Sequence, residues 1–144
     1  MRDLTRNLPL AGRHWRKIGR AAAARHGISE PASAPLLWIE RLGGNVRQNL
    51  LADAIGIDGA SLVRLLDELQ TTGMVTRVPD PKDRRANVVN LTPAGRHLVG
   101  EVEETLNKLR LRVFAKLPRE DIEAALRVYA TLSKAAESID ELDP

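Results

Sequence analysis

The chain has 144 residues, a length that suits one domain with a single substantial core. It is 43% hydrophobic and only 3% aromatic, so its core must be mainly aliphatic, which favours helices, and its net charge of +3 makes the position of the basic residues more informative than their total. It contains no cysteine and no long apolar run, so we expect no disulfide, no thiolate zinc site, no membrane span and no secretory leader, and the cytoplasm is the expected location.

The N-terminal third predicts two helices. The first covers about 10–26, where apolar residues recur at helical spacing and Gly27 follows as a C-terminal cap. These apolar residues are Ala11, Trp15, Ile18 and Ala22, and a second stripe holds Arg13, Arg16, Lys17 and Arg20. The stretch "SEPASAP" interrupts the pattern, because two prolines cannot lie inside a regular helix. A second helix is therefore expected around Leu36 to Leu42, ending at the glycines 43–44.

The segment 45–73 predicts a helix-turn-helix. Asn45 and Gln48 have the spacing of a capping box for a first short helix, whose apolar face would be Leu50, Leu51, Ala54 and Ile55. "GID" is a short turn, and Asp58 is a good N-cap for the helix "GASLVRLLDELQTT", which Gly73 ends. The core stripe of that helix would be Leu62, Leu65, Leu66 and Leu69. Two short helices joined by a short glycine turn are typical of this motif.

A wing is predicted next. "MVTRV" and "NVVNL" are short and rich in β-branched residues, so they indicate two strands. Between them lie the nine residues Pro79 to about Asn87, a long loop for a hairpin, in which two to five residues are usual. Thr92 then caps a long helix with Pro93 at its first position. Pro118 separates that helix from a last one, whose apolar face would be Ile122, Ala125, Leu126, Tyr129, Leu132, Ala136 and Ile139.

The stretch "LADAIGIDGASLVRLLDELQTTGMVTRVPDPKDRRANVVNLTPAGR" resembles the winged helix-turn-helix of the MarR family of bacterial transcription regulators. Within it, Asp83, Arg85, Val89, Leu91 and Thr92 match the family's wing pattern D-x-R-x-x-x-V-x-L-T. The close resemblance covers about 45–96, and the flanking helices are similar to those of the family in length and order.

The resemblance implies a mainly α fold with a small β-hairpin wing (α+β). Residues 45–92 would form the winged helix-turn-helix, and 1–44 together with 93–144 would form a helical dimerisation region. It further implies a ligand-responsive transcriptional repressor that binds a pseudo-palindromic double-stranded operator as a homodimer, without a cofactor. A small aromatic or anionic effector, bound between the dimerisation and DNA-binding regions, would release the DNA.

The second helix of the motif supplies candidate contacts to the major groove. Its small N-terminal residues Gly59 and Ala60 would allow a close approach, while Ser61, Val63 and Arg64 could contact base edges, a thymine methyl group or phosphate. The start of the preceding helix is a natural phosphate site, with Arg47, Gln48 and Asn49. The plainer interpretation is a solvated helix with one surface arginine and a Gln48 that only completes a cap.

The wing supplies candidate contacts to the minor groove. Arg85 would enter the groove with Asp83 holding it extended, and Lys82 and Arg84 would contact phosphates. The plainer interpretation is a charged hairpin whose Asp–Arg pairs add little stability. A winged-helix dimer that contacts only proteins is the alternative function, and it predicts neutral substitutions at Arg64 and Arg85. An enzyme is disfavoured, because no nucleophile elbow, phosphate loop or metal motif occurs.

Three residues are candidates for the effector site. His14, Trp15 and Trp38 lie where the resemblance places a ligand cleft, and a flat pocket with a nearby cation suits an aromatic carboxylate. Tryptophans at helical spacing are nevertheless more often core residues, and a lone histidine is more often structural. His26 and His97 have no metal-ligand spacing with His14, so no metal is expected.

Overall fold

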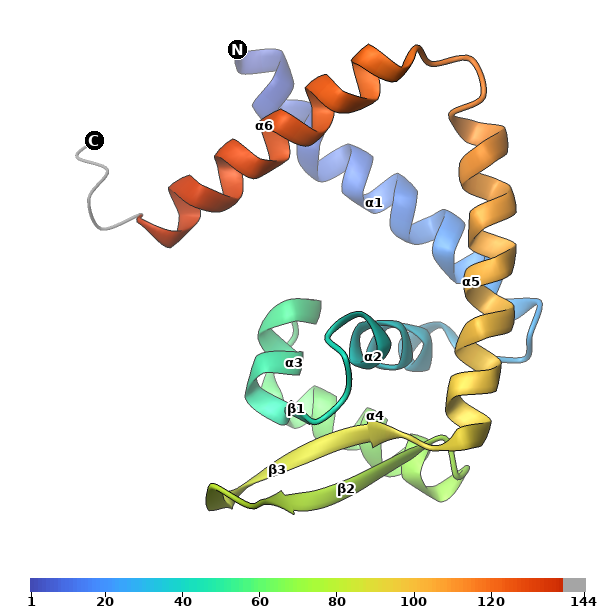
Figure 1. Cartoon of the computed structure of the whole chain (residues 1–144), viewed down its shortest axis with the longest axis vertical. Coiled ribbons are helices and arrows are strands. Elements are labelled where there is room, and N and C mark those ends of the chain that lie inside the picture. Colours follow the sequence, from blue (N-terminus) through green and yellow to red (C-terminus); the bar gives the residue numbers. More distant parts are fainter. Residues whose placement is uncertain (139–144) are drawn as a thin grey trace. The chain divides into compact units, whose positions relative to one another are not determined.

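The structure is a computed structural model that describes residues 1–138, apart from the side chains of Glu30, Arg84 and Arg85. The chain divides into two compact units, residues 1–107 and 108–144. The helices are α1 (Arg2–Ala24), α2 (Glu30–Arg41), α3 (Gln48–Ile55), α4 (Gly59–Thr71), α5 (Pro93–Val113) and α6 (Arg119–Glu137), and the strands are β1 (Val46–Arg47), β2 (Val75–Asp80) and β3 (Asp83–Leu91) (Figure 1). The expected mainly α fold with a small β-sheet is confirmed.

The first unit holds the core. Helix α2 contacts α1, α3, α4 and β3, and α4 packs against β2. The sheet is antiparallel with the order β1-β3-β2, so it has one strand more than the predicted hairpin. The large apolar side chains that are fully buried in the first unit include Leu36, Ile39, Leu51, Leu62, Leu66, Val75, Val89 and Val102. The stripe expected on α4 faces the core at Leu62, Leu66 and Leu69, because apolar residues three and four apart share one side of a helix, and Leu65 is half-buried.

The helix-turn-helix is formed by α3 and α4, as predicted. Gly56 has the left-handed conformation that ends α3, with φ 79°. Asp58 is the N-cap of α4, and Gly73, with φ 73°, follows its end. Thr92 caps α5, since the Gly95 N–H donates to Thr92 Oγ1 over 3.0 Å. Each of these caps lies within a few residues of the backbone group that it satisfies.

The two prolines of "SEPASAP" lie inside α2, contrary to the prediction. Pro31 is in the first turn, where the helix requires no hydrogen bond from the backbone nitrogen. Pro35 forfeits one backbone hydrogen bond, but its side chain is fully buried in the core. The first helix likewise begins at Arg2 rather than near Leu10 and includes Pro9. Residues 1–7 are exposed, so water can satisfy a carbonyl that a proline leaves free.

The predicted capping box of Asn45 and Gln48 is wrong. Val46 and Arg47 pair with Val89 and Val88 of β3, so a short strand lies between Asn45 and α3. The N-cap of α3 is Arg47, without a side-chain cap hydrogen bond. Asn45 instead pairs with Asn90: its N–H donates to Asn90 Oδ1 over 2.7 Å, and Asn90 Nδ2 donates to Asn45 Oδ1 over 2.9 Å. The face of α3 also differs, because Leu50 is 56% exposed while Leu51 and Ala52 are buried.

The wing is a hairpin of longer strands with a short turn, and the predicted nine-residue loop is wrong. Strand β2 extends to Asp80 and β3 begins at Asp83, so only Pro81 and Lys82 form the turn. Asp80 pairs with Asp83 and Pro79 with Asn87, which leaves residues 84–86 in an irregular step of β3. β2 is an edge strand, where one side faces water and charged residues and proline are tolerated. The β-branched pattern therefore underestimated the length of the strands.

The second unit contains the end of α5 and helix α6, of which residues to 138 are described. The predicted restart at Pro118 is confirmed, with Glu120 and Asp121 in the first turn of α6. Its predicted apolar face is present but α6 has no buried residue, since Ile122, Leu126, Tyr129 and Leu132 are all exposed. Ile139 lies outside the described residues. No helix in the described range 1–138 combines the length and apolarity needed to cross a membrane.

Candidate nucleic-acid interface

The N-terminus of α4 presents small and basic residues on its outer side. Gly59, Ala60, Val63 and Arg64 are exposed, while Leu62 and Leu66 point into the core. Arg64 has no hydrogen bond or ion pair with the described part of the chain. The residues expected to meet a major groove therefore share one accessible surface, and its one cation is available for an external partner.

Ser61 makes two hydrogen bonds within the chain, so it is less available to DNA than the sequence indicates. Its N–H donates to Asp58 Oδ1 over 2.9 Å, and its hydroxyl donates to Asp58 Oδ2 over 2.7 Å. These two hydrogen bonds from Ser61 hold the pKa of Asp58 below its ordinary value. Because the single hydroxyl proton of Ser61 is used, its oxygen can accept a hydrogen bond from a nucleic-acid base but cannot donate one.

Arg47 joins the start of α3 to the hairpin. Its Nε donates to Asp80 Oδ2 over 2.6 Å, and the backbone N–H of Lys82 donates to Asp80 Oδ1 over 2.8 Å. Asp80 is only 5% exposed, and its pKa is lowered, first by the hydrogen bond from Lys82 and then by Arg47. In the structure Arg47 holds the hairpin, and no pattern in the sequence indicates Asp80 as its partner. The expected contact of Arg47 with phosphate stays a prediction.

A second arginine joins the hairpin to α4. Arg77 of β2 donates from Nε to Gln70 Oε1 over 2.7 Å and forms an ion pair with Asp67. Arg47 and Arg77 thus connect the hairpin to both helices of the motif. Sequence reasoning missed Arg77 as well, because its partners lie on a different element.

The structure describes the side chains of some of the remaining candidates for DNA contact but not of all of them. Lys82 lies in the turn, and both Lys82 and Asp83 are exposed. The side chains of Arg84 and Arg85 are outside the described residues, although their backbone belongs to β3. Gln48 is half-buried, and its Oε1 is buried without a hydrogen-bond partner in the part of the chain that is described. Asn49 is exposed.

A cavity of about 690 Å³ lies within the first unit. Trp15 and Trp38 both line it, whereas His14 is exposed and does not. Its cationic residues are Arg16, Arg20 and Arg41, and its wall on the side of the helix-turn-helix is Ala54, Ile55, Ile57 and Leu65. Two of the three predicted effector residues therefore meet in one cavity that also contacts α4.

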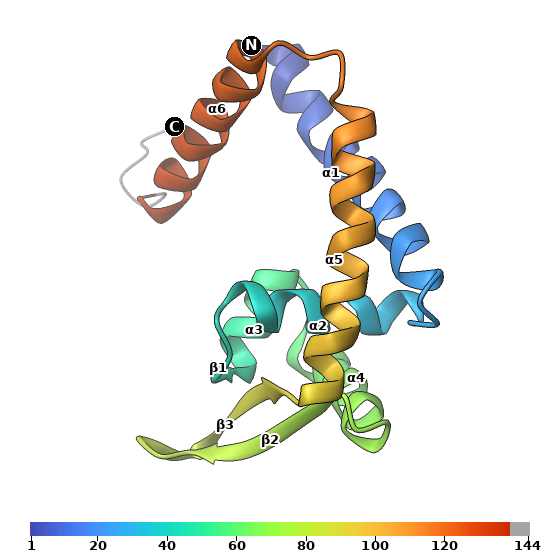
Figure 2. The same ribbon diagram turned by 45° about the vertical axis from the view of Figure 1, so that its right-hand side comes forward.

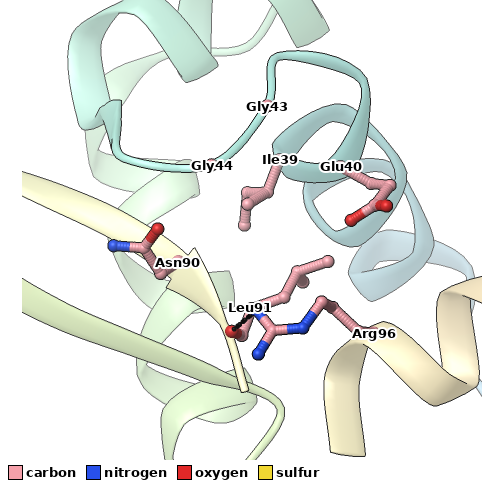
Figure 3. Close-up of a pocket in the computed structure, with 7 residues that line it drawn as sticks. All are labelled: Ile39, Glu40, Gly43, Gly44, Asn90, Leu91 and Arg96. Atoms are coloured by element: carbon pink, nitrogen blue, oxygen red, sulfur yellow. Dashed lines mark hydrogen bonds between the residues drawn. The ribbon is translucent and has the colours of Figure 1, made fainter. Parts of the chain in front are cut away.

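A smaller pocket of about 270 Å³ lies where α2, the turn at Gly43 and Gly44, and the end of β3 meet the start of α5 (Figure 3). Arg96 donates to the carbonyl of Leu91 over 2.9 Å and so ties α5 to β3. Gly44 has φ 75°, and a Cβ there would meet Asn90 Oδ1 at 3.0 Å. The Asn45–Asn90 pair thus requires the close backbone approach that glycine allows, which identifies this pocket as a structural junction.

Comparisons with known proteins agree with this architecture. The model of the MarR family matches residues 26–86. The crystal structure of the transcriptional regulator PA3341 is 27% identical, with a TM-score of 0.85 over 94% of this chain and 98% of that one. A MarR transcriptional regulator from Methanosarcina mazei Go1 is 20% identical, with a TM-score of 0.78 over 95% and 99%. CouR from Rhodococcus jostii RHA1, solved bound to p-coumaroyl-CoA, is 24% identical, with a TM-score of 0.76 over 90% and 91%.

Proposed function

Because this chain belongs to the MarR family of transcription regulators, we propose that it binds operator DNA as a homodimer and that an effector in the 690 Å³ cavity releases the DNA. The observation that carries the proposal is the outer side of α4, where small residues surround the unpaired Arg64 next to a firmly attached hairpin. Gly59 and Ala60 let the helix approach the floor of the major groove, and Arg64 reaches guanine or phosphate.

The hairpin is the proposed minor-groove element. The links from Arg47 to Asp80 and from Arg77 to Asp67 fix its direction relative to α4, so DNA binding need not order it first. Arg85 is the proposed minor-groove residue on the sequence pattern alone, with Lys82 and Arg84 toward phosphates. Two copies of this module would meet pseudo-palindromic half-sites roughly 34–36 Å apart.

The dimer is proposed from the apolar side chains that one chain leaves uncovered. Leu126 and Tyr129 of α6 are at least half exposed, and Leu111 and Val113 at the end of α5 are also exposed. Exposed large apolar side chains in this number are typical of a face that another protein covers. A second copy of the chain supplies the same apolar residues, as an isologous two-fold interface requires.

The effector is proposed to act by contact with the DNA-binding motif. The cavity has two tryptophans for an aromatic ligand and arginines for an anionic one. It also touches Ile55, Ile57 and Leu65, so a ligand that requires more room would shift α4 and lower the affinity for DNA. The proposed protein is therefore a repressor that its ligand releases from the operator. CouR, which has a similar fold, is solved with p-coumaroyl-CoA bound.

Fluorescence anisotropy with DNA from upstream of the protein's own gene tests the proposal. Arg64→Ala and Arg85→Ala should each cost about 1–3 kcal/mol of binding free energy, and a contact to phosphate should also reduce the salt slope by about 0.9. Arg112→Ala, at an exposed position on α5, is the matched control and should bind as the wild type does. If the wild-type chain shows no salt-dependent binding and both variants are neutral, the module serves protein contacts instead.

A further inference from the structure

We propose that Ser61, with its hydroxyl group oriented by Asp58, selects an operator base that carries an amino group, adenine or cytosine, and that Arg64 selects a guanine next to it. The inference rests on the proposed DNA-binding function and names the base sequence that α4 prefers. Its basis is which of these side chains can donate a hydrogen bond to a base and which can only accept one.

The side chains of Asp58 and Ser61 form a surface that only accepts hydrogen bonds. An ionised carboxylate has no proton to donate, and Ser61 gives its single hydroxyl proton to Asp58 Oδ2 over 2.7 Å. The backbone N–H of Ser61 is also used, because it donates to Asp58 Oδ1 over 2.9 Å. The Ser61 hydroxyl oxygen keeps a lone pair, so a base that meets it must supply the proton.

The charge of Asp58 fixes the direction of the Ser61 hydroxyl group. A hydrogen bond to an ionised carboxylate is about twice as strong as one between neutral groups, so the hydroxyl does not readily turn toward a base. The same two hydrogen bonds lower the pKa of Asp58, which keeps the carboxylate ionised at neutral pH. Asp58 is therefore the positioning residue, and Ser61 is the residue that contacts the base.

An acceptor at this place distinguishes the two strands of the duplex. In the major groove each base pair carries one amino group, on adenine or on cytosine, whereas guanine and thymine present only acceptors. A serine can ordinarily read either kind of base, because its hydroxyl both donates and accepts. With the proton held by Asp58, a guanine or thymine oxygen facing Ser61 would be left without a hydrogen bond. Adenine or cytosine on that strand is therefore preferred.

Arg64 has the opposite hydrogen-bonding character. Its guanidinium only donates, and guanine, with O6 and N7, accepts both of its hydrogen bonds. Positions 61 and 64 are neighbours on one side of the helix, about 4.5 Å apart along its axis at 1.5 Å per residue. Successive base pairs are about 3.4 Å apart, so the two side chains meet adjacent base pairs.

The surface of Ser61 and Arg64 is accessible and lies close to the wing. Gly59 and Ala60 are exposed and small, so they leave room for a base beside Ser61. Helix α4 packs against β2, and it lies beside the β2–β3 hairpin in both views of the first unit (Figures 1 and 2). A duplex held by the hairpin would therefore present its adjacent major groove to α4.

Fluorescence anisotropy with a panel of operator duplexes tests the assignment. Footprinting on DNA from upstream of the protein's own gene locates the operator, and each base pair of its half-sites is then replaced by the other three. For the wild type we expect one position at which adenine or cytosine is bound about fivefold more tightly than guanine or thymine, next to a position that prefers guanine. Ser61→Ala should remove most of the first preference and keep the second, and Arg64→Ala should do the reverse.

Asp58→Asn separates the orienting role of Asp58 from a purely structural one. Asparagine is an equally good N-cap residue, but its amide can donate to the Ser61 hydroxyl oxygen, which frees the hydroxyl proton for a base. The first preference should therefore invert to guanine or thymine, by about fivefold, while the preference for guanine at the neighbouring position stays. Asp53→Asn removes the same charge at an exposed position of α3 and should leave both preferences unchanged.

A base analogue tests the contact from the side of the DNA. An adenine or cytosine analogue without its amino group, placed at the first position, should weaken binding of the wild type about fivefold and leave binding of Ser61→Ala unchanged. The inference is overturned if the operator is bound but Ser61→Ala loses no preference for an amino base, or if Asp58→Asn keeps that preference. Salt-dependent binding of the operator would then still support the proposed function. If the wild type binds no duplex at any salt concentration, the proposed function fails and the inference fails with it.

Discussion

Gly95, in the first turn of α5, lies where this helix leaves the sheet, and replacing it by alanine tests the packing that positions the hairpin. A Cβ at Gly95 would lie 2.1 Å from the carbonyl oxygen of Met74 and 3.1 Å from its carbon. That carbonyl cannot move freely, because it accepts a hydrogen bond from the N–H of Thr92 over 3.0 Å. Thr92 is the N-cap of α5, so the clash acts on the cap that starts the helix.

The magnitude follows from the contacts. Relieving the overlap requires a shift of about 1 Å between α5 and the start of β2, and overpacking of this kind costs about 1–3 kcal/mol. Weakening the Thr92 hydrogen bond adds about 0.5–1.5 kcal/mol, and the higher helix propensity of alanine offsets about 1 kcal/mol. The expected net loss is about 2 kcal/mol, or roughly 4–8 °C in Tm for a chain of this size.

Urea unfolding followed by circular dichroism, at one fixed protein concentration, measures this loss. Gly100→Ala is the matched control, since Gly100 lies on the same helix and a Cβ there would meet nothing within 4 Å. It should stabilise the chain by about 0.4–1 kcal/mol. Effects of the same sign at Gly95 and Gly100 would refute the packing described here for the start of α5.

Three further predictions concern DNA binding, stability at low pH and dimerisation. Arg47→Ala and Asp80→Ala should each weaken DNA binding in anisotropy titrations, because each variant breaks the same ion pair. The double variant should lose no more binding free energy than the weaker-binding single variant. Additive losses would mean that Arg47 contacts phosphate instead. Because the pKa of Asp58 is lowered on folding, its ionised carboxylate stabilises the chain above the ordinary pKa of 3.8, and this stabilisation is lost as the pH falls through the lowered pKa. Asp58→Asn should therefore reduce the dependence of the free energy of unfolding on pH in the acid range. An unchanged dependence would contradict this role of Asp58. Leu126→Glu should raise the dimer dissociation constant at least tenfold in analytical ultracentrifugation without unfolding the chain, because Leu126 is 59% exposed in one chain, and an intact dimer would place the interface elsewhere.

The features that the sequence predicted correctly depend on near neighbours. Asp58 caps α4 through Ser61, three residues later, and Thr92 caps α5 through Gly95 at the same spacing. Gly73 ends α4 because a left-handed residue is required there. In each case the residue type and its partner fall within one turn, so a short window of sequence contains the whole interaction.

The features that the sequence did not predict depend on partners far along the chain. Arg47 and Asp80 are 33 residues apart, and Asn45 and Asn90 are 45 apart. Both pairs exist only because β1 and β2 flank β3, an order that no local pattern indicates. Without it, the spacing of Asn45 and Gln48 indicates a cap that the structure does not contain, and nothing indicates that Arg47 pairs with Asp80. The cavity was anticipated through its tryptophans, but helical spacing could not indicate that Arg16 and Arg20 also face it.

Helices α3 and α4 connect the cavity structurally to the hairpin. Ile55, at the C-terminal end of α3, lines the cavity, while Arg47, at the N-cap of the same helix, holds Asp80 of the hairpin. Leu65 of α4 lines the cavity too, and Asp67 of that helix holds Arg77 of β2. A ligand that displaces either helix would therefore move the hairpin as well as the recognition surface, since each helix is tied to it by a charged pair. Because such coupling is reciprocal in free energy, the proposed release of DNA by an effector predicts that operator DNA lowers the affinity for the effector by the same factor.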